Sequence, residues 1–337
     1  MRAIFIIILL AALVLPSGQA SASPLTDISA ADLQTLHAQA AQGEAKAQNN
    51  LGLLYYNGRG VPQDYAKARE WWEKASAQGN AVAQYNLGVL YDFGRGVPQD
   101  YAKARERYEK AAAQGYVDAQ YNLGVLYDFG WGVPQDYAVA REWVEKAAAQ
   151  GHAKAQTNLG VLYYNGRGVP QDYAKAREWW EKASAQGGAV AQYNLGVLSD
   201  FGRGVPQDYT KARQWYEKAA AQGYVDAQYN LGVLYDFGWG VPQDYAVAQE
   251  WFEKAPAQGH ARAQTNLGVL YQNGQSIPRD YVRAYMWYSL AAAHSPGDAQ
   301  RFAANNRDKV ARRLTPAQVG EAQRLTQQCQ AQQFKGC

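Results

Sequence analysis

The chain has 337 residues, 47% hydrophobic and 19% charged, so its composition excludes low-complexity disorder and a collagen repeat. Its 33 Lys and Arg residues nearly balance its 30 Asp and Glu residues. The formal charge of +3 is not the strong positive excess that binding to a nucleic-acid backbone requires. Two Cys and four His residues are too few for a structural metal site or a disulfide-rich scaffold. We therefore expect no metal, no cofactor and no nucleic-acid partner.

The first 22 residues have the pattern of an export signal. Arg2 provides a positive start, residues 3–15 are apolar, and the Ala-Ser-Ala at 20–22 is the small-residue pattern that signal peptidase reads. The apolar run is shorter than the roughly 20 residues of a membrane-spanning helix. An uncleaved anchor is the alternative. We expect cleavage after Ala22, no stable membrane span in the mature chain, and a periplasmic or secreted location.

Residues 23–42 are predicted to cap the start of a repeat array. Ser29 and Asp32 have the spacing of a helix start, and the helix should run to Gln42. The sequence LHAQAAQG in this segment resembles the second half of the repeat described next. A helix here would shield the first repeat from solvent.

A block of 36 residues occurs seven times. The segment AQYNLGVLYDFGRGVPQDYAKA, which begins at Ala83, returns with small changes at a constant step, as in a solenoid of stacked units. Residues 43–150 match residues 151–258 with 11 changes in 108 positions, which indicates duplication of a three-repeat block. The predicted repeats, which together span 43–296, are 43–78, 79–114, 115–150, 151–186, 187–222, 223–258 and 259–296.

Each repeat should be a helical hairpin. In the second repeat, apolar residues at helical spacing predict a first helix that ends at Gly94, and a turn follows through Pro98. Asp100 suits the start of a second helix, which Gly115 ends. Helices this short are marginal alone, so stacking of neighbouring repeats must stabilise them. The predicted buried stripe of the second helix is Tyr101, Ala104, Tyr108 and Ala111.

Residues 297–337 are predicted to close the array with capping helices and a short tail. Thr315, Pro316 and Gln318 form a helix-start pattern, and the last helix should run to about Gln330. Cys329 and Cys337 can pair within the chain in an oxidising compartment. An intermolecular disulfide or two free thiols are the alternatives.

The repeat motifs resemble a known family. The QxxLGxxY pattern at 84–91 and the GVPQDY turn look like the Sel1-like repeat, a relative of the tetratricopeptide repeat. The resemblance covers residues 43 to about 294, and the tail from near Arg307 resembles the capping helices of such arrays. It implies an all-α, α/α solenoid in a right-handed superhelix that binds other proteins, commonly in the bacterial envelope. One cysteine-rich branch has been described as β-lactamases, but the repeats here contain no cysteine.

Aromatic residues recur on the first helix, on the side opposite its apolar stripe. In related tetratricopeptide proteins the first helices line a concave side, so the resemblance implies a peptide-binding groove. Packing against adjacent first helices is the alternative for each ring. The Asn after each Tyr suits either a ligand main chain or a neighbouring turn, and the two loop Trp residues suit contact or packing. The candidate binding residues are Tyr85, Asn86, Phe93, Tyr121, Asn122, Phe129, Trp131, Tyr193, Asn194, Phe201, Tyr229, Asn230, Phe237 and Trp239.

Catalytic sequence motifs are absent: the chain has no SxxK, GxSxG, HExxH or phosphate-binding glycine loop. His152 and His260 occupy one repeat position, which favours duplicated turn residues over a ligand pair. We therefore expect an exported protein–protein interaction scaffold that binds an extended peptide or protein segment on its concave face, and not an enzyme. The alternatives are an envelope hydrolase of the cysteine-rich Sel1-like β-lactamase type and a purely structural spacer.

Overall fold

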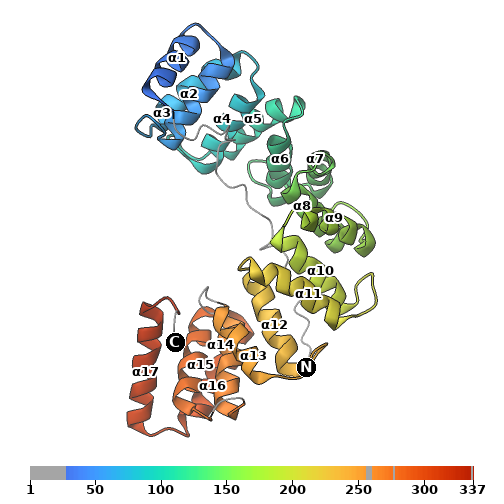
Figure 1. Cartoon of the computed structure of the whole chain (residues 1–337), viewed down its shortest axis with the longest axis vertical. Helices are drawn as coiled ribbons and strands as arrows, with labels where there is room; N and C mark the ends of the chain where they lie inside the picture. Colours follow the sequence, from blue (N-terminus) through green and yellow to red (C-terminus); the bar gives the residue numbers. More distant parts are fainter. Residues whose placement is uncertain (1–27, 256–259, 276–277, 335–336) are drawn as a thin grey trace. The chain divides into compact units, whose positions relative to one another are not determined.

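The computed structural model describes residues 28–255, 260–275, 278–334 and 337, which form seventeen helices and no strand (Figure 1). The fold is therefore all-α, as predicted. The chain divides into two compact units, one ending at Gln186 and the other beginning at Gly187. The expected export signal lies outside the described residues. Within the described ranges, no helix is both long enough and apolar enough to cross a membrane.

The helices follow one another in pairs. The N-terminal unit contains α1 (Ala30–Ala41), α2 (Ala45–Asn57), α3 (Tyr65–Ala77), α4 (Ala81–Phe93), α5 (Tyr101–Ala113), α6 (Val117–Phe129), α7 (Tyr137–Ala149), α8 (Ala153–Asn165) and α9 (Tyr173–Ala185). The C-terminal unit contains α10 (Ala189–Phe201), α11 (Tyr209–Ala221), α12 (Val225–Phe237), α13 (Tyr245–Lys254), α14 (Ala261–Asn273), α15 (Tyr281–His294), α16 (Gly297–Ala311) and α17 (Pro316–Ala331).

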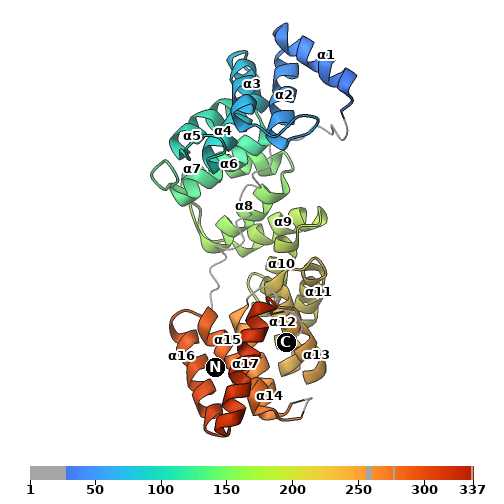
Figure 2. The ribbon, with the colours of Figure 1, turned by 90° about the vertical axis from the view of Figure 1, so that its left-hand side faces the viewer.

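Each repeat is the helical hairpin that the sequence predicts, shown for α4 and α5 in Figure 2. The first helix ends at Gly94, whose φ of 65° lies in the left-handed region that glycine adopts without strain. The second helix begins after Asp100, whose carboxylate accepts a hydrogen bond from the Lys103 amide at 3.0 Å. The turn and cap residues therefore fix where each helix stops and starts.

An aromatic residue packs on a helix glycine in the core of the repeat. The Tyr108 ring is fully buried, and a Cβ atom on Gly88 would lie 2.5 Å from it. Ala104 and Ala111, on the same stripe of α5, are also fully buried, whereas Tyr101 at its start is half-buried. Small residues thus allow the two helices of a hairpin to approach closely, as expected.

A chain of glutamine side chains links successive helices. Gln48 of α2 donates its amide to the Ala40 carbonyl of α1 at 3.1 Å and accepts from Gln78, at the end of α3, at 2.8 Å. The next repeats use the same pattern, with Gln114 donating to Gln84 at 2.7 Å and Gln150 to Gln120 at 2.8 Å. These bonds satisfy buried amides and link first helices to second helices in these repeats, whereas the side chain of the equivalent Gln264 in repeat seven has no hydrogen-bond partner among the described residues.

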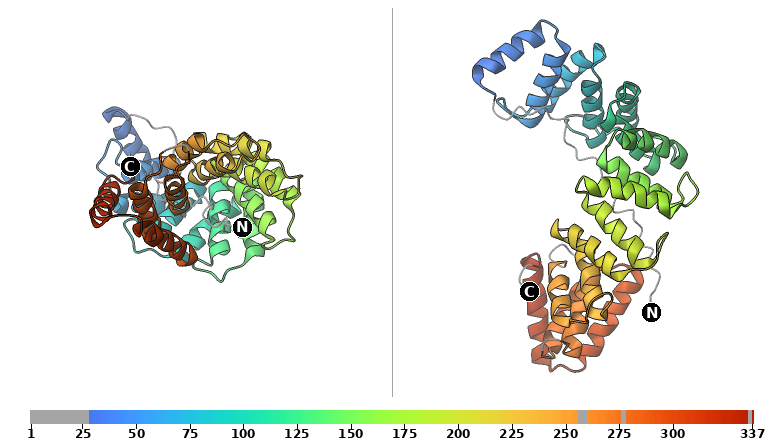
Figure 3. Two further views of the ribbon diagram at one scale, coloured as in Figure 1. Left: turned by 90° about the horizontal axis from the view of Figure 1, so that it is seen from below. Right: turned by 45° about the vertical axis from the view of Figure 1, so that its right-hand side comes forward.

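Helices are present at both ends of the repeat array. The Ser29 hydroxyl oxygen accepts from the Asp32 amide at 3.1 Å to start α1. At the other end, Thr315 and Gln318 make the predicted reciprocal capping bonds at the start of α17. The α16 and α17 helices, in red in Figures 2 and 3, both pack against α15 of the last repeat.

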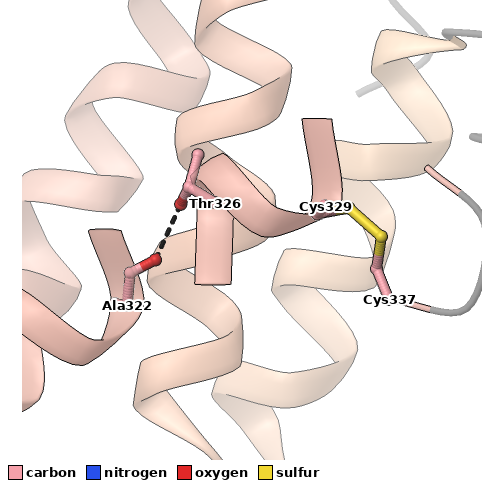
Figure 4. The surroundings of a disulfide bond; sticks show 4 residues. All are labelled: Ala322, Thr326, Cys329 and Cys337. Atoms are coloured by element: carbon pink, nitrogen blue, oxygen red, sulfur yellow. Dashed lines mark hydrogen bonds between the residues drawn. A yellow bond between two sulfur atoms is a disulfide. The ribbon is translucent and has the colours of Figure 1, made fainter. Parts of the chain in front are cut away.

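A disulfide joins Cys329 of α17 to Cys337, so the predicted intramolecular pairing is present in the structure (Figure 4). One turn before Cys329, the Thr326 hydroxyl donates to the Ala322 carbonyl at 2.8 Å. Cys329 is buried and belongs to the same hydrophobic cluster as Val310 of α16 and the last repeat. The disulfide therefore fastens the tail to a part of α17 that already contributes to the core.

Candidate functional site

The tyrosines of the expected groove are buried. Tyr85 is only 4% exposed, with its ring 5.6 Å from that of Tyr108 in its own repeat and 5.1 Å from that of Tyr116 in the next. Tyr121 and Tyr193 are buried as well, and Tyr229 is half-buried against Phe252 and His260. Tyr85 therefore packs on the second helix of its own repeat and on the residue that precedes the next first helix, and not on an adjacent first helix as the packing alternative held. The three buried rings leave almost no surface for a partner. Partner contact by them remains an untested prediction, which we do not carry into the proposed site.

The asparagines that follow these tyrosines are also drawn into packing. Asn86, which is fully buried, donates its amide to the Asn49 side chain of the preceding first helix at 3.3 Å. Asn158 donates to the Tyr121 hydroxyl in the same way at 3.3 Å. The partners lie on the neighbouring first helix, and not in a neighbouring turn as one alternative held. Asn122 and Asn194 are buried, and Asn230 is half-buried.

Burial also sets the charge state of this layer. Burial raises the pKa of the Tyr85 and Tyr121 hydroxyls, so both remain neutral hydrogen-bonding groups. Burial raises the pKa of Asp92 to about 6, against the opposing effect of the Tyr108 hydroxyl, which donates to its Oδ2 at 2.8 Å. The buried face of the first helices is therefore polar but not fully hydrogen-bonded, since both side-chain amide atoms of Asn194 are buried without a partner in the described part of the chain. Burial leaves these groups little access to an outside ligand.

The exposed rings are the phenylalanines at the ends of the first helices. Phe93 is 37% exposed, Phe201 48% and Phe237 56%, whereas Phe129 is half-buried. Each is the last residue of its helix, immediately before the left-handed glycine.

Loop residues support these phenylalanine rings. In repeats two and five an arginine lies over the ring, with the Arg95 guanidinium 5.6 Å from the Phe93 centroid and Arg203 at the same distance from Phe201. In repeats three and six a tryptophan replaces the arginine. Trp131 stacks on Phe129 at 4.6 Å, and Trp239 stacks on Phe237 at 4.8 Å.

Each tryptophan also stacks on a tyrosine of the preceding repeat. Trp131 lies 5.4 Å from Tyr101, and Trp239 lies 5.5 Å from Tyr209, with interplanar angles near 20° in both pairs. Three rings therefore form a continuous stack twice in the chain. We call Phe93, Phe129, Trp131, Phe201, Phe237 and Trp239 the loop aromatic residues.

Sequence reasoning missed the two tyrosines of these stacks. Tyr101 and Tyr209 each lie 30 positions before the tryptophan that contacts them, at the start of a second helix. The replacement of Arg by Trp in repeats three and six was a visible signal, but the contact itself depends on how consecutive repeats stack.

The duplicated histidines serve as helix caps. His152 Nδ1 accepts from the Ala155 amide at 3.1 Å, so the ring proton lies on Nε2, which is 3.2 Å from Asp118 Oδ1. This hydrogen bond is the main cause of the lowered pKa of Asp118. His260 and Asp226 repeat the arrangement at 3.3 Å. The expectation of duplicated turn residues fits this geometry, and within the described ranges no group of three or more His, Cys, Asp or Glu side chains could hold a metal ion.

Comparison with known families agrees with this architecture. The Sel1 repeat model matches the chain seven times, over residues 45–80, 81–116, 117–152, 153–188, 189–224, 225–260 and 261–295. The chain belongs to the Sel1 repeat family.

Two solved structures are similar to this Sel1 repeat protein. A Sel1 repeat protein from Oxalobacter formigenes is 37% identical, with a TM-score of 0.67 over 81% of this chain and 79% of that one. A protective antigen of uropathogenic Escherichia coli strains that displays the SLR fold is 31% identical, with a TM-score of 0.58 over 88% of this chain and 78% of that one. A search of curated proteins found no match. Membership of the Sel1 repeat family suggests a scaffold for protein–protein interactions.

Proposed function

We propose that this Sel1 repeat protein is an exported scaffold that binds an extended segment of a partner protein through its loop aromatic residues. The observation that carries the proposal is the recurrence of exposed phenylalanine rings at one repeat position, in repeats two, five and six. The rings recur at one position of the repeat, and aromatic rings contribute much of the binding energy in protein interfaces.

A loop side chain lies over each phenylalanine ring and supports it. A guanidinium or an indole lies over every one of the four phenylalanines, so each ring is held in place before a partner arrives. Ordering the rings in advance reduces the entropy lost on binding. The equivalent residues in repeats one, four and seven are Asn57, Asn165 and Asn273, so the apolar contacts are confined to particular repeats.

Export is supported by the leader pattern in residues 1–22 and by the Cys329–Cys337 disulfide, a type of bond that persists in oxidising compartments. We therefore propose a periplasmic or secreted location. Mass spectrometry of the protein from a cell fractionation would test this: a mature N-terminus at Ser23 in the non-cytoplasmic fraction is expected. Full-length protein in the cytoplasm would contradict it.

The binding surface can be tested with the mature chain as bait for extracytoplasmic proteins. The test variant changes Phe93, Phe129, Phe201 and Phe237 to Ser, and a matched control changes Phe302, which is 56% exposed on α16 outside this set. Wild type and the control should capture the same partner, and the test variant should lose it while its circular dichroism stays unchanged.

A second variant replaces the two loop tryptophans with the residue that other repeats have at the same position. Trp131→Arg with Trp239→Arg places in repeats three and six the residue that repeats two and five already contain. Capture should weaken if the stacked tryptophans contribute binding area. Full capture by a folded variant lacking the four phenylalanines would refute the proposed surface.

A further inference from the structure

The last repeat and the helices after it enclose a cleft that the sequence analysis did not find. Its volume is about 510 Å³, within the range of small-ligand and peptide-anchor pockets. It lies entirely in the C-terminal unit, between α13, the start of α15 and the turn that joins α16 to α17. Its lining residues are Gln249, Tyr271, Pro278, Arg279, Asp280, Tyr281, Val282, Arg283, Arg313, Leu314 and Gln318.

Positive charge dominates this cleft. Three arginines line it, against a single lining carboxylate, Asp280, whose Oδ2 lies 3.8 Å from Arg283 Nε. Asp280 also accepts from the Arg283 amide as the cap of α15, so part of its hydrogen-bonding capacity is already used. A second carboxylate, Glu253, lies nearby and accepts from Gln249 at 2.7 Å. A net positive cleft remains on a chain that is otherwise close to neutral.

Tyrosine hydroxyls accept hydrogen bonds from two of the three guanidinium groups, and Arg283 also lies within ion-pair distance of Asp280. Arg283 Nη1 donates to the Tyr271 hydroxyl at 3.0 Å, and Arg279 Nη1 donates to the Tyr281 hydroxyl at 3.4 Å. Neutral acceptors position a guanidinium without cancelling its charge. The remaining N–H groups of these forks can therefore pair with an external anion.

Arg279 departs from the repeat pattern at this place. The other six repeats have Gln at the same position, and its amide braces the loop, as when Gln243 donates to the Asp236 carbonyl at 2.7 Å. In repeat seven the side chain instead contacts the Tyr281 hydroxyl beside the cleft. Repeat seven has therefore exchanged a loop-bracing amide for a positive charge at the side of the cleft.

We propose that this cleft binds an acidic segment of a partner protein, with Asp or Glu carboxylates paired to Arg279, Arg283 and Arg313. Charge complementarity identifies the occupant, and Pro278, Val282 and Leu314 supply apolar contacts for its side-chain methylenes. Gln249 and Gln318 also line the walls, where Gln249 Nε2 already donates to Glu253 and Gln318 Oε1 already accepts from the Thr315 amide. The inference rests on the proposed function and specifies the chemistry of one segment of the partner.

The probe is a fluorescein-labelled hexaglutamate peptide with blocked termini, titrated with the mature protein at low salt and followed by anisotropy. A hexaglutamine peptide of the same design controls for the dye and the main chain. Wild type should bind the glutamate peptide, lose it progressively as salt is raised, and leave the glutamine peptide unbound.

Three single variants locate the site. Arg279→Gln restores the residue of the other six repeats, and Arg313→Gln removes a guanidinium from the turn after α16. Arg324→Gln makes the same charge change at an exposed position of α17 outside the cleft. Losing one charge-assisted pair should weaken binding about five- to tenfold in each cleft variant, and less than about twofold in the control. Thermal unfolding checks that all three variants remain folded.

Two results would overturn the proposal: no binding by wild type, or equal weakening by Arg324→Gln and the cleft variants, which would show a diffuse charge effect. The outcome is separable from that of the proposed function. Peptide binding reports on the cleft alone, whereas partner capture by the phenylalanine variant reports on the loop aromatic residues alone.

Discussion

Replacing Asp92 with Asn should stabilise the protein at pH 8 and leave its stability almost unchanged at pH 4. The Asp92 carboxyl is 5% exposed, and burial raises its pKa from 3.8 to about 6 in the folded chain. The folded state therefore holds this proton more tightly than the unfolded state does. The stabilisation that the protonated Asp92 carboxyl provides is fully present below about pH 4, and it is lost as the pH rises through about 6.

The size of the effect follows from the two pKa values. Ionising Asp92 in the folded chain removes about 3 kcal/mol from the free energy of unfolding once the pH is well above 6. Asn keeps a hydrogen bond from Tyr108, which donates to Asp92 at 2.8 Å, and the stronger bond to the ionised carboxylate is already included in the pKa of about 6. The expected net gain is about 3 kcal/mol at pH 8.

Urea unfolding followed by circular dichroism at pH 4, 6 and 8 measures this difference. Asp100→Asn is the matched control, because Asp100 caps α5 at the surface and its pKa is lowered, chiefly by the hydrogen bond from the Lys103 amide. The control should give no gain at pH 8. The reasoning is refuted if Asp92→Asn gives the same change at pH 4 and pH 8, or no gain at pH 8.

Three further predictions concern stability. Gly88→Ala should destabilise the protein by about 1–3 kcal/mol, because the new Cβ would lie 2.5 Å from the Tyr108 ring. Gly320 lies inside α17, where an added Cβ would have no atom within 4 Å, so Gly320→Ala should stabilise the protein by about 0.5–1 kcal/mol. Melting temperatures equal to that of the wild type would contradict both glycine predictions. Reducing the Cys329–Cys337 disulfide should remove about 2.5 kcal/mol in the chain-entropy model, seen as a lower melting temperature with reductant. A Cys329→Ser, Cys337→Ser variant that responds equally to reductant would show that the shift has another origin.

The sequence predicted the repeat architecture well because local chemistry sets the helix ends. Gly94 and Asp100 stop and start helices through their own backbone and side chain, and the caps at Ser29 and Thr315 act within three residues. Such signals need no knowledge of the neighbouring repeat. Helix boundaries were therefore predictable to within a residue or two at these positions.

Accessibility was not predictable in the same way. A helical wheel places Tyr85 on the side away from its own hairpin, but the Tyr116 ring of the next repeat covers it. Tyr116 precedes α6 and has an extended backbone, so no helical periodicity indicates its position. The cleft lined by Arg279 was not predictable for a similar reason, because Arg313 lies after the last repeat, between α16 and α17.

The contacts of His152 and His260 show that the protein contains two nearly identical copies of one interface between successive repeats. His152 contacts Asp118 at 3.2 Å and Tyr121 at 4.7 Å, and His260 contacts Asp226 at 3.3 Å and Tyr229 at 4.6 Å. Unequal recombination between the two 108-residue blocks would add or remove three repeats, and the new neighbours would be repeats of types that already adjoin each other in this chain. Removing a single repeat would instead create a junction that the protein has never used. The array is therefore free to change length in steps of three.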